Sequence, residues 1–476
     1  MLNRRSFLKA ALAGGAAAAM PAALRAATSS SRPNIIFILA DDLGYGDLGC
    51  YGQKVIETPN LDRMASQGMR FTDFYAGSTV CAPSRSCLLT GLHTGHTYMR
   101  GNGKDVWLRD DPKDMTVARL LKNAGYSTAM IGKASTSCGV PDDLGHPNKK
   151  GFDHFFGVLS HWQAHFYYPE TVYRDGEAIQ LEDNHSHDGE YYCHDLYLQD
   201  ALGWIEEQSK QDDPFFMLYS AHIPHASLVV EPDRWKEMYE DKIEDDRKVP
   251  QRHYSGTDAA KAEFAGMVSR LDWEVGRIIR KLQSLGIDEN TIVMFASDNG
   301  AMNEGGHLED DFNSSGPLRG IKRELYEGGI RSPLIVRWPG RVKAGTVSHH
   351  VSSFWDFLPT ACELAGAKAP GDIDGISFAP TILGEKRSQE KHDYLYWEFH
   401  ERRGRRAVRI GDYKAVQYDV NRDPDGPVEV YNVAKDIDES EDIAGTHPEI
   451  VERAWKLFKT ARTRSPIERF NFPDSG

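Results

Sequence analysis

Three apolar runs constrain the fold of this chain more than any other feature of its sequence. Residues 34–40 (NIIFILA), 215–220 (FFMLYS) and 291–296 (TIVMFA) are almost continuously apolar. Such runs are typical of strands that are buried on both faces, as in a parallel sheet covered by helices. The runs therefore predict an α/β fold.

Helical patterns alternate with these runs. Thr58 and Pro59 open a pattern with apolar residues at helical spacing that ends at Gly68, which predicts a helix there. Further strands are predicted at residues 69–75, 127–131 and 333–337, and further helices at 116–124 and 257–285. This alternation indicates a sandwich with a large, mostly parallel central sheet flanked by helices.

The pattern changes after about residue 370. Short strands are predicted at residues 394–399, 407–410 and 413–418, followed by one helix at 450–460. We therefore expect a main domain over residues 32–370 and a small C-terminal subdomain, residues 371–476, with an antiparallel sheet and one helix.

The N-terminus predicts export. Arg4 and Arg5 precede Phe7 and an alanine-rich stretch over residues 10–24, which resembles a twin-arginine signal within residues 1–31. An ordinary secretory signal or a membrane anchor is the alternative, but the stretch is short and rich in alanine and glycine. We expect a periplasmic or secreted protein without a stable membrane span, exported by the twin-arginine machinery.

Charge and cysteine content exclude some function classes. The formal net charge of −14 argues against a nucleic-acid partner, which normally requires a basic face. The six cysteines are scattered and form no CxxC pair, so neither a zinc site nor a redox couple is indicated.

Oxygen-bearing side chains follow the first and last apolar runs. Asp41 and Asp42 follow residues 34–40, and Asp298 and Asn299 follow residues 291–296. A lone aspartate in such a place is most often a turn or a helix cap. Four oxygen donors at the carboxyl ends of two strands suit a hard cation such as Ca²⁺, with Mg²⁺ the alternative.

A cysteine-led run lies between these strands, residues 81–91 (CAPSRSCLLTG). Taken alone, it predicts a loop that opens a short helix, with Cys81 as a structural thiol. The run also resembles the sulfatase family signature, in which Cys or Ser, any residue, Pro, any residue and Arg precede Leu-Thr-Gly. Other segments resemble the family at residues 33–48, 125–133, 224–225, 298–300, 318–322 and 328–331.

The resemblance is strong over residues 32–339 and weaker beyond, where residues 394–398 (YLYWE) are similar to the C-terminal part of bacterial sulfatases that act on sulfated glycans. It implies an alkaline-phosphatase-like fold. It also implies that a formylglycine-generating enzyme converts Cys81 to formylglycine (3-oxoalanine). One hydroxyl of the hydrated aldehyde would attack sulfur, and the other would then expel sulfate.

The resemblance assigns a role to each matching residue. Ca²⁺ would be held by residue 81 and by four oxygen ligands, Asp41, Asp42, Asp298 and Asn299. Arg85 and Lys133 would support the formylglycine and the sulfate oxygens. His225, the general acid, and Lys322 would face the leaving oxygen. Without the resemblance, both lysines are ordinary solvated residues, and His225 with the nearby His222 is a surface or metal pair. With the resemblance, His222 is a further candidate for substrate binding.

One segment departs from the family pattern. Many sulfatases read Gly-Lys-Trp-His-Leu-Gly where residues 132–137 read GKASTS, so Ser135 replaces the histidine thought to assist the release of sulfate. A serine has an unsuitable pKa for a base near neutrality. His161 and His165 are candidates for a substitute base; contact with substrate or loop packing is the alternative.

A locally basic segment follows residue 398. His400 and Arg402 are candidates for binding sugar hydroxyls or a neighbouring sulfate, because arginine suits anion recognition. A solvated hairpin turn is the alternative.

These features predict a sulfuric ester hydrolase that releases sulfate from a sulfated polysaccharide or oligosaccharide. Two alternatives stay open: a phosphodiesterase or phosphonate hydrolase of the same fold, and a silent relative that only binds sulfated glycans.

Overall fold

A ten-stranded sheet runs through the computed structural model of this chain. The structure describes residues 32–473 except 110, 111, 138, 141, 245, 246 and 386–388, so the signal predicted over residues 1–31 lies outside the described part. In the sequence ranges that are described, no helix is both long and apolar enough to cross a membrane.

Five parallel strands form the middle of this sheet, and antiparallel strands flank them on both sides. The order is β11 (Thr346–Ser348), β2 (Met69–Phe71), β10 (Leu334–Arg337), β9 (Thr291–Ser297), β1 (Asn34–Ala40), β8 (Phe215–Ser220), β4 (Ser127–Lys133), β5 (His154–Val158), β6 (Thr171–Arg174) and β7 (Glu177–Gln180). Strands β9, β1, β8, β4 and β5 are parallel. The apolar runs thus form the buried centre, as predicted, because helices cover both of its faces.

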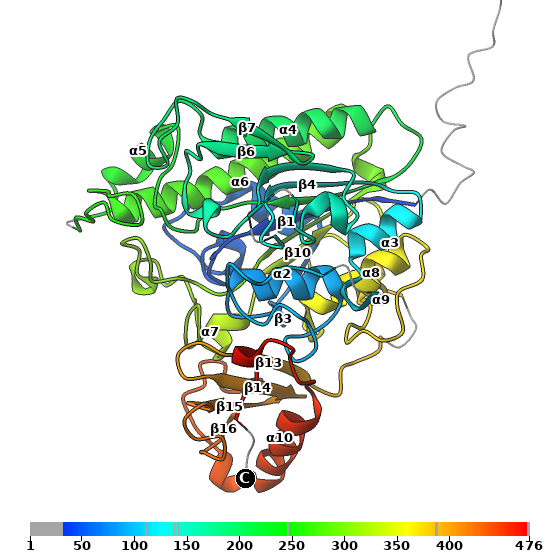
Figure 1. Ribbon diagram of the computed structural model, residues 1–476, viewed down its shortest axis with the longest axis vertical. Helices are drawn as coiled ribbons and strands as arrows, with labels where there is room; N and C mark the ends of the chain where they lie inside the picture. The colour runs from blue at the N-terminus through cyan, green and yellow to red at the C-terminus, as the bar shows by residue number, and fades with distance from the viewer. Residues whose placement is uncertain are drawn as a thin grey trace, which may run out of the picture. The chain divides into compact units, whose positions relative to one another are not determined.

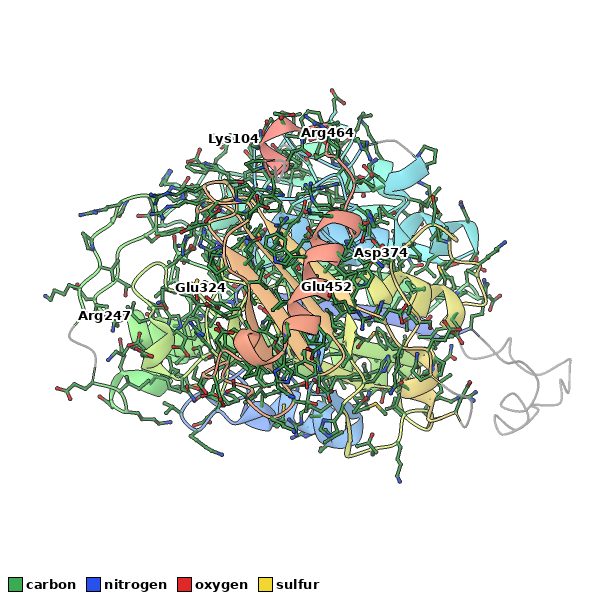
Figure 2. All side chains as sticks on the ribbon, turned by 90° about the horizontal axis from the view of Figure 1, so that it is seen from below. Lys104, Arg247, Glu324, Asp374, Glu452 and Arg464 are labelled. Atoms are coloured by element: carbon green, nitrogen blue, oxygen red, sulfur yellow. The ribbon has the colours of Figure 1, made fainter. Side chains whose placement is uncertain are left out.

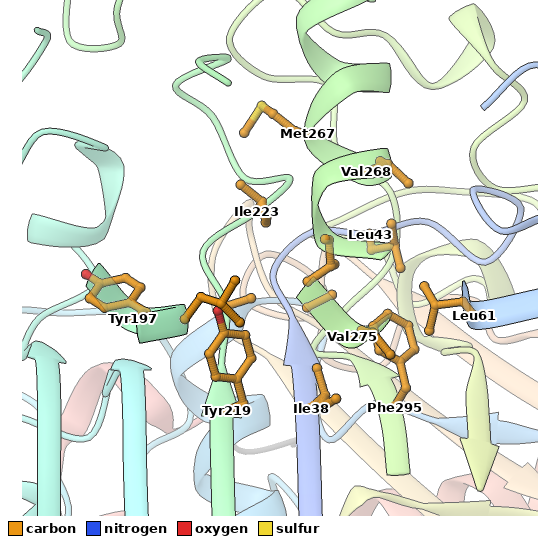
Figure 3. Packing of buried hydrophobic residues seen from close by; sticks show 14 of the residues in the cluster. Ile38, Leu43, Leu61, Tyr197, Tyr219, Ile223, Met267, Val268, Val275 and Phe295 are labelled. Atoms are coloured by element: carbon orange, nitrogen blue, oxygen red, sulfur yellow. The ribbon is translucent and has the colours of Figure 1, made fainter. Parts of the chain in front are cut away.

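Alternate residues of each central strand enter different cores. In β1, Ile36 and Ile38 pack with the helices α1 (Pro59–Gln67), α4 (Cys193–Gln208), α5 (Arg234–Glu240) and α6 (Ala260–Ser284). Figure 3 shows part of this core, with Ile38 and Phe295 of neighbouring strands below Val275 of α6. Ile35 and Phe37 enter the second core with α2 (Cys81–Thr90), α3 (Val117–Asn123), α8 (Phe357–Leu364) and α9 (Ala379–Leu383). The period of two along a strand produces these two layers.

A second, antiparallel sheet forms near the C-terminus, in the lower part of Figure 1. Its order is β13 (Leu395–Phe399), β14 (Arg405–Ile410), β15 (Tyr413–Tyr418) and β16 (Glu429–Asn432). One face packs against α10 (Pro448–Thr460), where Val408 meets Phe458 in a shared core. The other face, with Trp397, packs against Tyr75 and Trp355 of the main domain. The small sheet and its one helix are confirmed; the boundary near residue 370 stays a prediction.

The single strand predicted over residues 69–75 is wrong. The chain leaves the large sheet after Phe71, and β3 (Phe74–Tyr75) pairs instead with β12 (Ser352–Ser353). Asp73 lies at the break, where its carboxylate accepts hydrogen bonds from Arg331 Nη2 at 2.7 Å and Arg409 Nη1 at 3.0 Å. A buried arginine is costly without a counter-charge, so an acid is required at this break in the strand. The apolar pattern of residues 69–75 does not reveal that requirement.

Candidate functional site

The four predicted oxygen donors meet at the carboxyl ends of β1 and β9. Ala40 pairs with Ser297, so Asp41 and Asp298 leave the sheet side by side. The backbone N–H of Asp42 donates to Asp298 Oδ1 at 3.2 Å, and Asn299 Nδ2 donates to Asp42 Oδ1 at 2.8 Å. All four side chains are completely buried. They form what we call the oxygen cage: Asp41, Asp42, Asp298 and Asn299.

Three permanent cations surround the oxygen cage. Lys133, at the end of β4, donates to Asp41 Oδ2, and Lys322 Nζ donates to Asp42 Oδ2 at 2.6 Å. Arg85, on α2, donates from Nε to Asp298 Oδ2 at 2.9 Å. Burial alone would raise the pKa of Asp41, but the charges of Lys133, His225 and Arg85 outweigh it and hold that pKa well below its usual value.

The oxygen cage has the composition that a cation site requires. Asp41 Oδ1 and Asn299 Oδ1 are buried without a hydrogen-bond partner, which is costly unless another group satisfies them. Burial and the charge of Asp41 raise the pKa of Asp298 to about 7. A divalent cation would satisfy the free oxygens with the oxygen ligands that such ions prefer.

Cys81 is the first residue of α2 and is buried beside the oxygen cage. Its Sγ lies 3.7 Å from Asn102 Oδ1, which also accepts the backbone N–H of Ala82 at 3.2 Å. Burial raises the pKa of the thiol; Lys133 lowers that pKa, and Asp41 raises it further. An unmodified thiol here is therefore a weak nucleophile, because the thiolate is the reactive form.

His225 faces the oxygen cage from the loop after β8. Its Nε2 lies 3.5 Å from Asp42 Oδ2 and 3.4 Å from Lys322 Nζ. Its Nδ1 donates to the carbonyl of Ala226, which fixes the ring and leaves Nε2 as the nitrogen directed at the site.

The two candidates for a substitute base lie behind His225. The ring of His165 stacks on that of His225, with centroids 5.0 Å apart and planes 11° apart. The centroid of the His161 ring lies 6.5 Å from that of His165. His165 Nδ1 lies 2.6 Å from His253 Nε2. Ser135 is buried with its Oγ unpartnered.

The remaining candidates lie elsewhere. His222 is buried among Cys193, His194 and Tyr197, and its backbone N–H donates to His194 Nε2 at 3.2 Å. His400 lies 3.0 Å from the buried Glu398, while Arg402 is exposed in the turn between β13 and β14. In the described part of the chain, none of the three forms a hydrogen bond or an ion pair with the oxygen cage, so their role in substrate binding stays a prediction.

Sequence reasoning missed several residues of this site: Asn102, Ser220, His253, Tyr254 and Glu304. The hydroxyl of Ser220 donates to the carbonyl of Lys133. Its polar side chain at the end of an apolar run could have identified it from the sequence as a site residue. Nothing in the sequence marks Asn102 or Glu304, because their loops reach the site only through the tertiary fold.

Family models match most of this chain. The sulfatase model matches residues 33–367, a model described as N-sulphoglucosamine sulphohydrolase, C-terminal, matches residues 321–462, and a twin-arginine signal model matches residues 1–21. The last match indicates export from the cytoplasm to the periplasm or the exterior.

Curated relatives and solved structures agree with the family models. The chain is 35% identical to N-acetylgalactosamine-6-sulfatase of Mus musculus, covering 82% of this chain and 73% of the relative. It is 33% identical to human arylsulfatase A, covering 94% of this chain and 89% of that relative. The crystal structure of Ps i-CgsB in complex with k-i-k-neocarrahexaose has a TM-score of 0.75 and 25% identity over 90% of this chain and 93% of that one.

A further structural likeness is to the phosphonate monoester hydrolase of Agrobacterium radiobacter, with a TM-score of 0.64 and 21% identity over 90% and 95% of the two chains. At this identity only the alkaline-phosphatase-like fold is shared. The sulfatase model and the curated relatives together cover nearly all of the described chain. The chain therefore belongs to the sulfatase family and is a sulfuric ester hydrolase.

Proposed function

We propose that this enzyme releases sulfate from a sulfated polysaccharide or oligosaccharide, with formylglycine at position 81 and Ca²⁺ in the oxygen cage. The observation that carries the proposal is the pair of partnerless buried oxygens, Asp41 Oδ1 and Asn299 Oδ1, beside Cys81. Glycan substrates are supported by the relative named N-acetylgalactosamine-6-sulfatase and by the solved structure of Ps i-CgsB in complex with k-i-k-neocarrahexaose.

Each group of residues in the site has a distinct proposed role. Asp41, Asp42, Asp298 and Asn299 would hold the calcium ion, which supplies Lewis-acid chemistry when bound. Residue 81, as the hydrated aldehyde, would supply an oxygen nucleophile in place of the weakly nucleophilic thiol. Arg85 and Lys133 would fix this nucleophile and neutralise sulfate oxygens.

His225 would serve the leaving group. Its Nδ1–H is bonded to the Ala226 carbonyl, so a proton gained at Nε2 can pass to the ester oxygen as the sulfur–oxygen bond breaks. Lys322 Nζ, 3.4 Å from Nε2, adds positive charge where the leaving oxygen becomes negative.

Matched esters test the proposal. The enzyme, made together with a formylglycine-generating enzyme, should hydrolyse 4-nitrophenyl sulfate at least 100-fold faster than 4-nitrophenyl phosphate, and Cys81→Ala should abolish the activity. Cys50→Ala is the matched control, because Cys50 is only partly buried and lies outside the site. A preference for 4-nitrophenyl phosphate, or for the diester bis(4-nitrophenyl) phosphate, would favour a phosphoester hydrolase of the same fold, and glycan binding without any hydrolysis would favour a silent relative.

A further inference from the structure

Trp162 and Lys104 form an exposed pair at the border of the site, and neither has a part in the chemistry proposed above. Trp162 is 44% exposed, whereas the other eight tryptophans, all within the described ranges, are buried or partly buried. Lys104 Nζ lies 4.8 Å from the centroid of the Trp162 ring. His253 packs against the indole with centroids 4.3 Å apart and planes 32° apart. We call Trp162 and Lys104 the rim pair.

Two arms of the chain bring the rim pair together. One arm starts at Asn102, which contacts Cys81, and reaches Lys104 two residues later. The other runs from His165, which stacks on His225, back to Trp162 three residues earlier. The arms therefore begin beside residue 81 and beside His225, and they meet at the rim pair.

The charges around His161 agree with this placement. Burial, then the charges of Lys133, His225 and Lys104, lower the pKa of His161 to about 4. His161 thus lies within the field of two site residues and one member of the rim pair.

Both arms are anchored. Asp105, next to Lys104, forms a two-contact ion pair with Arg469, with both distances 2.6 Å. Figure 2 labels both Lys104 and Arg464, a residue of the same C-terminal segment, in the upper part of the view. On the other arm, His253 is held by His165 at 2.6 Å while it packs on Trp162. Anchoring matters because a fixed surface loses less entropy when a ligand binds.

A single exposed aromatic residue is common and carries no inference alone. The rim pair differs because an indole face and an ammonium lie together beside the site of an acidic protein. An exposed cation–π contact is worth only about 0.5–1 kcal/mol, so a ligand can displace it readily. The ligand that matches presents a ring with an apolar C–H face and a negative group. The ammonium would also offset the repulsion that a net charge of −14 exerts on an anionic polymer.

We propose that the rim pair binds the saccharide unit next to the sulfated one and selects a unit that carries a carboxylate or a second sulfate. This inference rests on the proposed function, because it assumes that the sulfate ester is part of a glycan. The Trp162 ring stacks on the neighbouring sugar, and Lys104 pairs with its anion.

Inhibition constants of disaccharides against 4-nitrophenyl sulfate hydrolysis test the inference even where a disaccharide is a poor substrate. Three probes are used: a 6-sulfated N-acetylgalactosamine linked to a uronate, a disaccharide sulfated on both neutral sugars, and one sulfated on a single sugar. The variants are Trp162→Ala and Lys104→Met. The controls are Tyr191→Ala, a 36% exposed aromatic residue, and Lys343→Met, an exposed lysine.

Trp162→Ala should raise the inhibition constants of all three probes about fivefold. Lys104→Met should raise only those of the two probes with an anionic neighbouring sugar, by about the same factor. Both variants should keep kcat/KM for 4-nitrophenyl sulfate within twofold, and the controls should change nothing. The stronger of the two anionic probes identifies carboxylate or sulfate as the recognised group.

The inference is overturned if either variant leaves all inhibition constants unchanged. It is also overturned if Lys104→Met weakens the singly sulfated probe as much as the others, or if 4-nitrophenyl sulfate hydrolysis falls in parallel with binding. Failure of the wild-type enzyme to hydrolyse any sulfate ester contradicts the proposed function instead. Calorimetric titration with the same probes then still tests the rim pair.

Discussion

Ser135 stands at the position where many sulfatases have a histidine. It is buried, its Oγ has no partner, and its backbone lies in the left-handed region with φ 53°. A serine cannot take up a proton near neutral pH, so under the proposed mechanism another group would assist the release of sulfate. His165 is the candidate because its ring stacks on that of His225; burial and the charge of His225 lower its pKa, which keeps the ring neutral but weakens it as a base.

His165→Gln should therefore slow sulfate release more than ester cleavage. We expect kcat to fall about 100-fold and rapid mixing with 4-nitrophenyl sulfate to reveal a burst of nitrophenol equal to the enzyme concentration. His187→Gln is the control, because its ring contacts Phe166 and Ser255 rather than His225. An unchanged kcat, or a reduced kcat without a burst, would exclude His165 as the base.

Asn299 provides the corresponding test of the oxygen cage. Asn299→Ala removes one partnerless oxygen and the hydrogen bond to Asp42. We expect the calcium concentration for half-maximal activity to rise at least tenfold, with kcat partly restored at saturating calcium. Titration of activity after chelation measures this, and metal analysis of the dialysed protein checks it. Full activity of the wild type in excess chelator would show that the cage needs no ion.

At the scale of elements, Asp272 of α6 caps the N-terminus of α1. Its carboxylate accepts the backbone N–H of Asn60 at 2.9 Å and that of Leu61 at 2.7 Å. Burial raises its pKa to about 6 even so, against about 3.9 in the unfolded chain. The folded state then holds the proton more tightly, so stability from this group is complete below pH 4 and is lost as the pH rises through 6.

Asp272→Asn should remove this pH dependence, because the amide oxygen can still accept the N–H groups but does not ionise. The free energy of unfolding of the wild type, relative to the variant, should fall by about 1–3 kcal/mol between pH 4 and pH 7. Urea unfolding at several pH values measures it. A difference that is constant with pH, or one that grows with pH, contradicts the assigned pKa direction.

The elements also show how far sequence patterns reach. The apolar runs identified β1, β8 and β9 because buried parallel strands have no polar face to obscure them. The strand over residues 69–75 failed because two buried arginines bind Asp73. The strands β5, β6, β7, β11, β12 and β16 went unrecognised, since each has five residues or fewer and so short a run carries a weak period-two signal.

The residues of the site also fall into those that the sequence identifies and those that only the fold reveals. Cys81, Arg85, Lys133, His225 and Lys322 were found because the family motif fixes their order along the chain, and the fold brings them together. Asn102, His253 and Glu304 lie in loops without a motif, and only the tertiary structure brings them to the site.

At the scale of the whole molecule, a buried ion cluster joins the C-terminal sheet to the main domain. Lys414 of β15 lies 2.9 Å from both Glu327 and Glu439, and all three are completely buried. Burial favours protonation of Glu327, but the charges of Lys414 and Arg331 lower its pKa to about 2. Glu327 also lies 3.0 Å from Arg331 Nε, so Lys414 is the cation that the two carboxyl groups share.

Lys414→Met should destabilise the protein by about 3–5 kcal/mol, because it removes the ammonium that two buried carboxyl groups share. Thermal unfolding should show a fall of several degrees, whereas Lys435→Met, at an exposed lysine, should leave the transition unchanged. A small effect of Lys414→Met would mean that the carboxyl groups are protonated together and that the cluster does not hold the sheet in place.

The most direct test of the account is peptide mass spectrometry across Cys81, on protein made together with a formylglycine-generating enzyme. The account predicts that the peptide carrying residues 81–85 is about 18 Da lighter than its sequence mass, because the thiol has become an aldehyde. Persistence of the thiol, under conditions that convert a control sulfatase, would contradict the proposed nucleophile and would leave glycan binding as the leading function.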